Sequence, residues 1–413
     1  MARRKAVYPL EQWTGEVGRR LPHLSKPQAA VLAAWSFGMV LAHSCALTAV
    51  AGILAALLGS KASTERQRLR EFCYPVERKR GAHRQATAVE PCFAPLLRWV
   101  LDRWPSDHVL LGLDATTLGE RFVVLAISVL YRGCAIPVAW AIVPAGKRGA
   151  WRPVWERLLA ALRAGVPRRD LVVLVLADRG LYAKWLFQAI VAQGWHPLLR
   201  INSGGMFRPA CWRHFHPLHQ FVPTPGQQWQ GTGCAFKSSG SRLPCTLLAR
   251  WEAGHRDPWL LLTDLAPETS EAGWYGLRQW IEHGFCVSKR GGWQWQQTKM
   301  TAPDRAERLW LAIAVRVPSG RLWLLAVGGE AEAAEACAAA DAAGAAIAAG
   351  ARRRHRRQQP RLVGVFRRGW YRLLAALLTA APLPFGAFLP EPLPHRVPLP
   401  RTDLHDEPAE AAA

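Results

Sequence analysis

The sequence contains no CxxC pair, and its nine cysteines are an odd number scattered along the chain. A disulfide framework needs paired cysteines, so free thiols in a reducing cytosol fit the pattern better. The histidine-rich stretch CWRHFHPLH at 211–219 has no second pair of residues at ligand spacing elsewhere. A zinc site there is therefore possible but not favoured.

An apolar core of the kind found in signal peptides is also missing, because the start MARRKAVYPLEQW is basic and mixed. The most apolar region, 29–59, is interrupted by polar residues and by two glycines. We therefore expect two packed helices of a soluble domain there, and less readily a membrane span. The expected location is the cytoplasm, with no membrane partner.

Acidic residues are scarce. Asp and Glu number 30 against 53 Lys and Arg, which gives a net charge of +23 and a pI near 10.6. Such an excess favours a polyanionic partner, and nucleic acid is the commonest one for a soluble protein of this size. An anionic membrane surface is the competing interpretation.

The pattern of apolar residues changes along the 413 residues, which are enough for more than one domain. Residues 1–105 are predicted to form a helical N-terminal domain that binds DNA. Residues 106–320 then alternate between strand and helix patterns. The strands are predicted at 108–118, 121–131, 134–143, 171–178 and 195–202, and the helices at 151–165 and 181–194.

Three antiparallel strands followed by alternating helix and strand predict an α/β protein with a ribonuclease-H-like mixed sheet, covered on both faces. A β-rich insertion is expected at about 203–265, with strands at 245–251 and 258–265. A further helix is expected at 305–317. Residues 321–413 are interpreted as an Ala-rich and basic linker followed by a frayed, Pro-rich tail.

Two aspartates directly follow apolar runs of predicted strands. Asp114 lies in LLGLDATTL on the first strand, and Asp178 ends LVVLVLAD on the fourth. A charge beside a buried strand is costly unless it is paired or binds a cation. The first and fourth strands neighbour each other in the expected fold, so the two carboxylates would face each other and share Mg²⁺ or Mn²⁺. Alternatively, Asp178 has the ordinary structural role of capping the N-terminus of the helix predicted at 181–194.

A third carboxylate stands on the stretch WYGLRQWIEHGFCVSKRGG at 274–292. Tyr275, Arg278, Glu282 and Lys289 fall within about 60° of one another on an α-helical wheel. An ordinary amphipathic helix would carry aliphatic residues at these positions. We interpret Glu282 as a metal ligand, and the other three as a stripe that faces DNA phosphates.

At this stretch the chain resembles a known family. YGLRQWIEHGFCVSK fits Y-x2-R-x3-E-x6-K, the signature of a large group of bacterial DDE insertion-sequence transposases. GLDATT and VLADRGLY are similar to that group's two aspartate motifs and occur in the same order. The resemblance covers roughly residues 105–320 and implies that Asp114, Asp178 and Glu282 form a catalytic triad. In related transposases an aromatic residue of the insertion stacks on a flipped base, a role open here to Trp251 or Trp259.

The function expected from these features is a DNA transposase that cleaves and joins DNA at the ends of an insertion sequence through two-metal phosphodiester transfer. Its partners would be double-stranded DNA, as terminal inverted repeats and as target, and a second copy of the chain in a homodimer on DNA. Two alternatives stay open. One is a host or domesticated nuclease with the same fold, and the other is an inactive DNA-binding relative.

Overall fold

The protein is represented by a computed structural model. The residues that it describes are 2–79, 84–146, 151–168, 170–289, 292–319, 328–329, 364–379, 381–382, 388–395 and 398–402. The Ala-rich stretch 331–351 and the RRRHRR run 352–357 lie outside the described residues.

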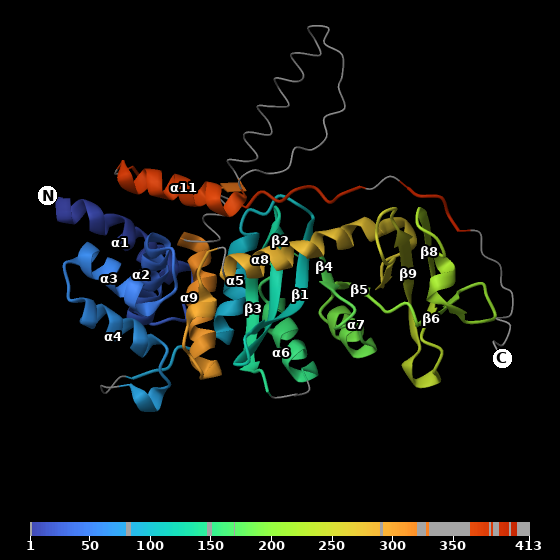
Figure 1. Cartoon of the computed structure of the whole chain (residues 1–413), viewed down its shortest axis with the longest axis horizontal. Coiled ribbons are helices and arrows are strands. Elements are labelled where there is room, and N and C mark those ends of the chain that lie inside the picture. The colour runs from blue at the N-terminus through green and yellow to red at the C-terminus, as the bar shows by residue number, and fades with distance from the viewer. Residues whose placement is uncertain are drawn as a thin grey trace, which may run out of the picture.

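The N-terminal region is helical, as the sequence predicts, and forms one end of the molecule (Figure 1). Ser25 opens the second helix with a reciprocal capping box to Gln28, and Gly59 closes the third in a left-handed conformation. The helices are α1 (Ala2–Arg20), α2 (Lys26–Ala42), α3 (Leu47–Leu58), α4 (Ala62–Phe72) and α5 (Phe93–Leu101).

The apolar region 29–59 forms α2 and α3, which meet at a bend of 99°. No single helix among the described residues is long and apolar enough to cross a membrane. Taken together, the bent pair passes the same test of length and composition.

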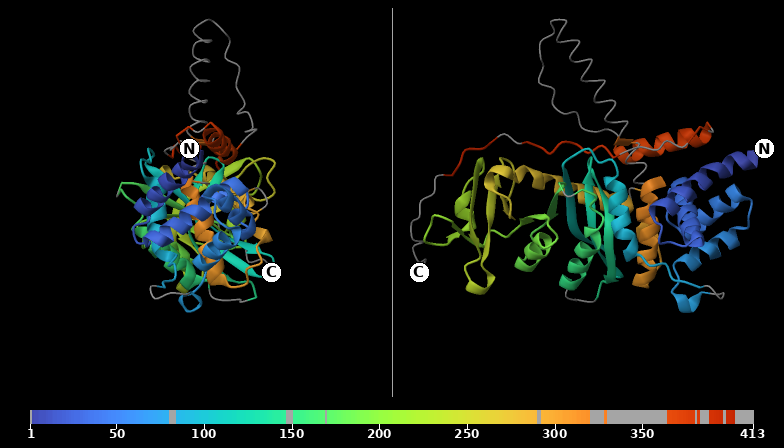
Figure 2. Two further views of the ribbon diagram at one scale, coloured as in Figure 1. Left: turned by 90° about the vertical axis from the view of Figure 1, so that its left-hand side faces the viewer. Right: turned by 180° about the vertical axis from the view of Figure 1, so that it is seen from behind.

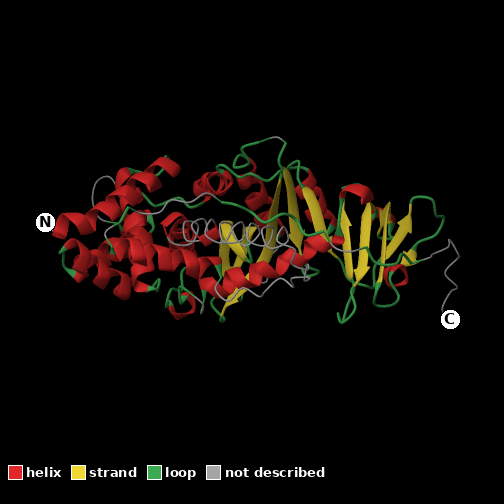
Figure 3. Ribbon diagram, turned by 90° about the horizontal axis from the view of Figure 1, so that it is seen from above, coloured by secondary structure: helices red, strands yellow, loops and turns green. Residues whose placement is uncertain are grey.

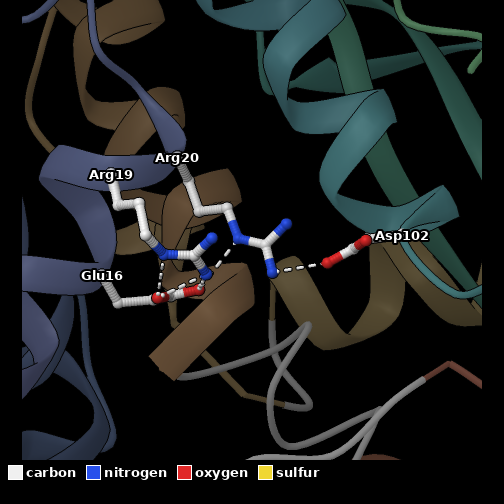
Figure 4. Close-up of polar contacts among 4 residues, drawn as sticks. All are labelled: Glu16, Arg19, Arg20 and Asp102. Atoms are coloured by element: carbon white, nitrogen blue, oxygen red, sulfur yellow. Dashed lines mark hydrogen bonds and ion pairs between the residues drawn. The ribbon is translucent and has the colours of Figure 1, made fainter.

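A small ionic network connects the N-terminal helices to the rest of the chain (Figure 4). The Arg20 guanidinium lies 2.9 Å from Glu16 on its own helix and 2.7 Å from Asp102, the residue that follows α5. Next to it, Trp13 of α1 stacks on Trp99 of α5 with ring centroids 6.1 Å apart. The apolar core is continuous from α1 and α2 to the sheet.

The centre of the molecule is a mixed sheet of ten strands in the order β3-β2-β1-β4-β5-β10-β9-β8-β6-β7. β1 is parallel to β4 and β4 to β5, whereas β1, β2 and β3 pair antiparallel. The predicted mixed α/β class is therefore confirmed. The first five strands are β1 (His108–Leu118), β2 (Phe122–Tyr131), β3 (Cys134–Pro144), β4 (Val172–Ala177) and β5 (His196–Arg200).

Helices cover both faces of the sheet (Figure 3). One face packs against α5 and three further helices. These are α6 (Arg152–Arg163), α7 (Lys184–Val191) and α9 (Pro303–Ser319). The other face packs against a 3-10 segment η6 (Ala272–Arg278) and the helix α8 (Gln279–Ser288) that follows it. The predicted helices at 151–165, 181–194 and 305–317 agree with α6, α7 and α9 to within a few residues.

The insertion is β-rich, as predicted, but it continues the central sheet through β10, which pairs with β5. Its strands are β6 (Met206–Pro209), β7 (His216–Pro217), β8 (Gln227–Ala235), β9 (Leu243–Trp251) and β10 (Trp259–Thr263). The first three were not predicted, because stretches such as QQWQGTGCA alternate polar residues with glycine and carry little apolar periodicity.

The expectation of a frayed C-terminal tail is wrong for the part that the structure describes. The helix α11 (Val365–Leu378) was not predicted, and the described pieces 388–395 and 398–402 that follow it lie against the body of the protein (Figure 2). The Leu389 N–H donates to the Tyr131 hydroxyl at 3.2 Å, and the Gln228 N–H donates to the Pro400 carbonyl at 3.0 Å. Proline restricts the unfolded chain, so ordering this segment against the body costs less entropy than for an ordinary sequence.

Candidate active site

Asp114 and Asp178 emerge on the same face of the sheet at neighbouring positions. Leu113 pairs with Ala177 in the parallel ladder between β1 and β4, and the two aspartates are the next residue on each strand. Side chains alternate along a strand, so Asp114 shares its face with Leu110, which packs under η6 and α8. The predicted juxtaposition of these two residues is therefore present in the structure.

Backbone amides hold one oxygen of each carboxylate. The Ala115 N–H donates to Asp114 Oδ1 at 2.8 Å, and the Gly180 N–H donates to Asp178 Oδ1 at 2.9 Å. Asp178 does not cap α7, which begins at Lys184 and has Ala183 at its N-cap. The second oxygen, Oδ2, of each carboxylate remains directed at a common point.

That point is occupied by the Arg278 side chain. Its Nη2 atom lies 3.1 Å from Asp114 Oδ2 and 3.2 Å from Asp178 Oδ2. Its Nη1 atom lies 4.0 Å from Glu282 Oε1, one helical turn further on. A single guanidinium therefore faces all three carboxylates that the sequence singled out, and it contacts the two aspartates directly.

Burial dominates the electrostatics of this cluster. Desolvation raises the pKa of the Asp114 carboxyl above its ordinary value, and the nearby Arg278 charge offsets only part of that effect. Arg278 is itself mostly buried, with a side chain only 14% exposed, and its Nε has no hydrogen-bond partner within the described residues. Glu282, by contrast, is 72% exposed.

The predicted single helix at 274–292 is wrong in its first part. Residues 272–278 form 3-10 turns, and the α-helix starts at Gln279 and ends at Ser288. A 3-10 helix turns faster than an α-helix, so the wheel on which four residues formed one stripe does not apply across Arg278. The helix also ends before the glycines at 291 and 292, of which only Gly292 is described.

As a result, Tyr275 does not share an exposed stripe with Arg278. It is 5% exposed and lies edge-on to Trp259 with ring centroids 5.8 Å apart. Burial raises the pKa of Tyr275 to about 12. The Arg200 guanidinium, which hydrogen-bonds to the phenol oxygen, acts to lower this pKa. The expected phosphate-facing role of this phenol is not supported by its position, because it forms part of the wall behind Arg278.

Lys289 reaches back to β1 from the end of α8. Its Nζ donates to the Thr116 hydroxyl at 2.7 Å and to the Thr117 carbonyl at 2.8 Å. Thr116 is two residues beyond Asp114 and so lies on the same face of the strand. Lys289 therefore fastens the end of α8 beside the aspartates.

The two candidate stacking residues differ in their surroundings. Trp259 lies against Tyr275 and is half-buried close to Arg278. Trp251 is also half-buried, but its indole N–H donates to the His255 carbonyl at 2.9 Å in the turn between β9 and β10. Of the two, Trp259 is the one that contacts the 3-10 segment carrying Arg278, through the Tyr275 ring.

Sequence reasoning missed Arg200, which ends β5. Its guanidinium lies over the Tyr275 ring, 6.0 Å from the centroid, and donates to the Pro258 carbonyl at 3.2 Å. Leu198, two residues earlier, packs on the η6 face, so the alternation of side chains along β5 could have placed Arg200 there. The wall of the site thus contains a second guanidinium.

Two glycines allow α8 to lie close to the sheet. A Cβ at Gly112 would stand 2.3 Å from the Ile281 Cδ1 atom, and a Cβ at Gly284 would stand 2.8 Å from the Ala135 Cβ and 3.1 Å from its carbonyl oxygen. Real Cβ contacts are longer, and a backbone oxygen cannot move aside as a flexible side chain can. These glycines therefore set the height at which α8 presents Glu282 above β1 and β3.

We expect Gly284→Ala to destabilise the protein by about 1–3 kcal/mol, because the added methyl overpacks the contact between α8 and β3. The matched control is Gly52→Ala on α3, where a Cβ would have no atom within 4 Å. That change should be neutral or stabilise by up to about 1 kcal/mol. Urea unfolding of both variants is the measurement, and equal midpoints would contradict the close packing of α8.

Two of the three predicted metal ligands are arranged so that they could bind a hard divalent cation together. Two carboxylate oxygens converge on one cationic atom, and carboxylates are the ligands that Mg²⁺ and Mn²⁺ prefer. In the described part of the chain, no group of three or more His, Cys, Asp or Glu residues is close enough to hold a metal ion. Asp114 and Asp178 therefore fit such an ion as a pair, whereas Glu282 faces the far end of Arg278. The cysteine and histidines of the described stretch 211–219 also form no such group.

No family model matches the chain, and no curated protein is significantly similar to it.

Proposed function

We propose that the protein is a DNA transposase that cleaves and joins phosphodiester bonds with the help of a divalent metal. The observation that carries the proposal is the pair of neighbouring carboxylates, Asp114 within β1 and Asp178 directly after β4, whose Oδ2 atoms lie 3.1 and 3.2 Å from one nitrogen. The strand order β3-β2-β1-β4-β5 supports a ribonuclease-H-like assignment for the centre of the sheet. The resemblance of 274–292 to the transposase signature supports the reaction class.

Each residue of the site has a proposed role. Asp114 and Asp178 would hold Mg²⁺ or Mn²⁺, and backbone amides already fix the orientation of both carboxylates through their Oδ1 atoms. When bound, such ions activate a water or a 3′-hydroxyl and stabilise the leaving oxygen. Glu282 lies one turn beyond Arg278 on the covering helix, where it completes the acidic set. Arg278 balances the carboxylate charge and can grip a DNA phosphate bidentately.

The remaining side chains bind DNA or position the site. Lys289 holds the end of α8 against β1, and its ammonium group is proposed to bind a DNA phosphate beside the aspartates. Trp259 is proposed as the stacking residue in preference to Trp251, because it lies next to the Tyr275 wall. The protein would act on the paired ends of its element as a homodimer, in the bacterial cytoplasm.

The test is to incubate the full chain with duplex DNA taken from the flanks of its own gene. If the flanks contain matched inverted repeats and the protein cuts at their ends only when Mg²⁺ or Mn²⁺ is added, the proposal holds. Metal-dependent cutting without preference for these ends would instead identify a host nuclease of the same fold. Binding without cutting under any metal would identify an inactive relative.

Salt dependence tests nucleic acid as the main partner. With 53 Lys and Arg against 30 Asp and Glu, contacts to several phosphates should release counterions on binding. We expect the affinity for duplex DNA to fall about a hundredfold or more between about 50 and 200 mM salt. Fluorescence anisotropy measures it, with the melting temperature followed over the same range to show that the protein stays folded. A flat response would contradict the proposal.

A further inference from the structure

The described part of the C-terminal tail contains a run in which every residue either is a proline or precedes one. It reads LPEPLP at 389–394. The proline ring fixes φ at about −65°, and the residue before a proline is kept out of the helical region. The run is therefore committed to an extended, polyproline-like backbone before it meets the rest of the protein, and it loses little conformational entropy on binding. Residues 388–394 are called the tail peptide below.

The tail peptide lies in a groove with aromatic residues in its walls. The groove is bounded by β1 and the end of β2 on one side and by the junction of η6 and α8 on the other. Its lining includes Trp104, Leu110, Leu130, Tyr131, Leu277 and Trp280. The cavity left between the groove and the tail peptide is about 20 Å³, roughly the room of one water. Grooves lined by aromatic residues are the surfaces on which proteins recognise proline-rich segments.

Polar contacts fix the register of the tail peptide. Proline has no N–H, so the few other residues must supply the backbone donors. The Leu389 N–H donates to the Tyr131 hydroxyl at 3.2 Å, and the Arg132 guanidinium donates to the Leu389 carbonyl. The same guanidinium, on a side chain only 10% exposed, lies 3.9 Å from Glu391 Oε1. Phe388 packs edge-on against Tyr131, with ring centroids 5.2 Å apart. The groove therefore fits a carboxylate as well as prolines.

The groove backs onto residues that adjoin the candidate active site. Leu277 and Trp280 stand on either side of Arg278, whose Nη2 atom contacts both aspartates. From the tail peptide, Leu393 packs against the apolar cluster that joins η6 and α8 to the sheet. The tail peptide is thus wedged between the end of β2 and the start of α8, the helix that carries Glu282.

We propose that this groove is a binding site for a short, proline-rich, acidic peptide, and that its reversible occupation by the tail peptide holds η6 and α8 in the position that the active site needs. Phe388 is the only buried residue of the tail peptide, so the peptide can leave the groove while the core stays folded. With the groove occupied, Arg278 and Glu282 are fixed relative to the aspartates. The inference rests on the proposed function only where it concerns cleavage, because peptide binding needs neither DNA nor metal.

The test variant is the full chain with Glu391→Arg and Leu393→Asp. It leaves the groove intact but places like charge beside Arg132 and a carboxylate in the apolar cluster. The probe is a fluorescent synthetic peptide of residues 387–396, AFLPEPLPHR. It should bind this variant at least about tenfold more tightly than the wild type, whose own tail competes at a local concentration in the millimolar range. Glu391→Arg alone should show the same change to a smaller degree, which keeps the test decisive if the double variant does not fold.

A further substitution tests the groove itself. Adding Arg132→Glu to the test variant should weaken peptide binding about tenfold, and a peptide with Glu391→Arg should recover part of that loss through the reversed charge pair. The matched control is Arg103→Glu, an equal change of charge at an exposed residue that also has a positive φ, 59° against 42° at Arg132. This control should leave peptide binding unchanged.

Hydrogen exchange measures the effect on α8. Amides of Gln279–Ser288 should exchange about tenfold faster in the test variant than in the wild type, and excess peptide should restore slow exchange. Metal-dependent cleavage should fall and recover with it. Equal peptide binding by the wild type and the variant, unchanged exchange of α8, or normal cleavage despite faster exchange would overturn the inference. A chain that binds the peptide and protects α8 but cuts no DNA would contradict the proposed function alone.

Discussion

Asp114→Asn is expected to reduce metal-dependent strand cleavage by about a thousandfold or more while leaving the affinity for DNA largely intact. Asn keeps the size of the side chain, and its amide oxygen can still accept from the Ala115 N–H. It removes the negative charge that would hold a divalent cation, whose contribution to phosphodiester chemistry is worth several kcal/mol. A loss of about 4 kcal/mol corresponds to about a thousandfold in rate.

The matched control for this experiment is Asp264→Asn. Asp264 also follows a buried apolar strand, β10, but its carboxylate pairs with His196 at 3.1 Å. Cleavage by this variant should stay within a few fold of the wild type. If Asp114→Asn instead abolished DNA binding, or if both variants cleaved normally, Asp114 would have a structural role and the proposed active site would be wrong.

The adjacency of Asp114 and Asp178 was predictable because each directly follows an apolar run, and the expected fold places the first and fourth strands side by side, as the structure does. β1 begins and ends where the sequence indicates, at His108 and Leu118. Period-two alternation along β1, β4 and β5 also determines which side chains share a face. Applied to β5, it would have found Arg200 as well.

The predictions that the structure contradicts depend on tertiary contacts that no local sequence pattern encodes. The wheel analysis of Tyr275 and Arg278 assumed 100° per residue, whereas tertiary packing against Trp259 and Arg200 holds this segment in 3-10 turns. Local propensity cannot reveal that choice. Likewise, the Pro-rich tail makes its contacts with Tyr131 and Gln228, more than a hundred residues away in sequence, and no local pattern encodes such partners.

Arg278→Gln is expected to make the stability of the protein depend on divalent metal. In the wild type, Arg278 Nη2 donates to both aspartates, and its side chain is only 14% exposed. Removing one partner of a mostly buried ionic cluster leaves like charges facing each other and costs several kcal/mol when burial is complete. Asp178 is 37% exposed, so water screens part of the repulsion, and we expect a loss of about 2 kcal/mol.

Mn²⁺ or Mg²⁺ should reverse that loss, because the ion and the guanidinium would use the same two Oδ2 atoms. At a hundredfold excess over its dissociation constant, a bound ion stabilises by about 2.7 kcal/mol. In the wild type the ion must first displace Arg278, so the rise in melting temperature should be smaller than in the variant. Calorimetry with and without the ion measures both, and Arg278→Gln combined with Asp178→Asn should abolish the response.

Arg121→Gln is the control that isolates the carboxylates. Arg121 also donates two hydrogen bonds, to the Thr298 and Met300 carbonyls at 2.5 and 3.0 Å, and it forms no ion pair with an acidic group among the described residues. Its loss should destabilise the protein with no recovery on adding metal. If Arg278→Gln and the wild type gained the same stability from the ion, Arg278 and the metal would not compete, and the carboxylate pair would not be the metal site. Recovery confined to Arg278→Gln would mean that this arginine balances the charge of the active site until the metal arrives.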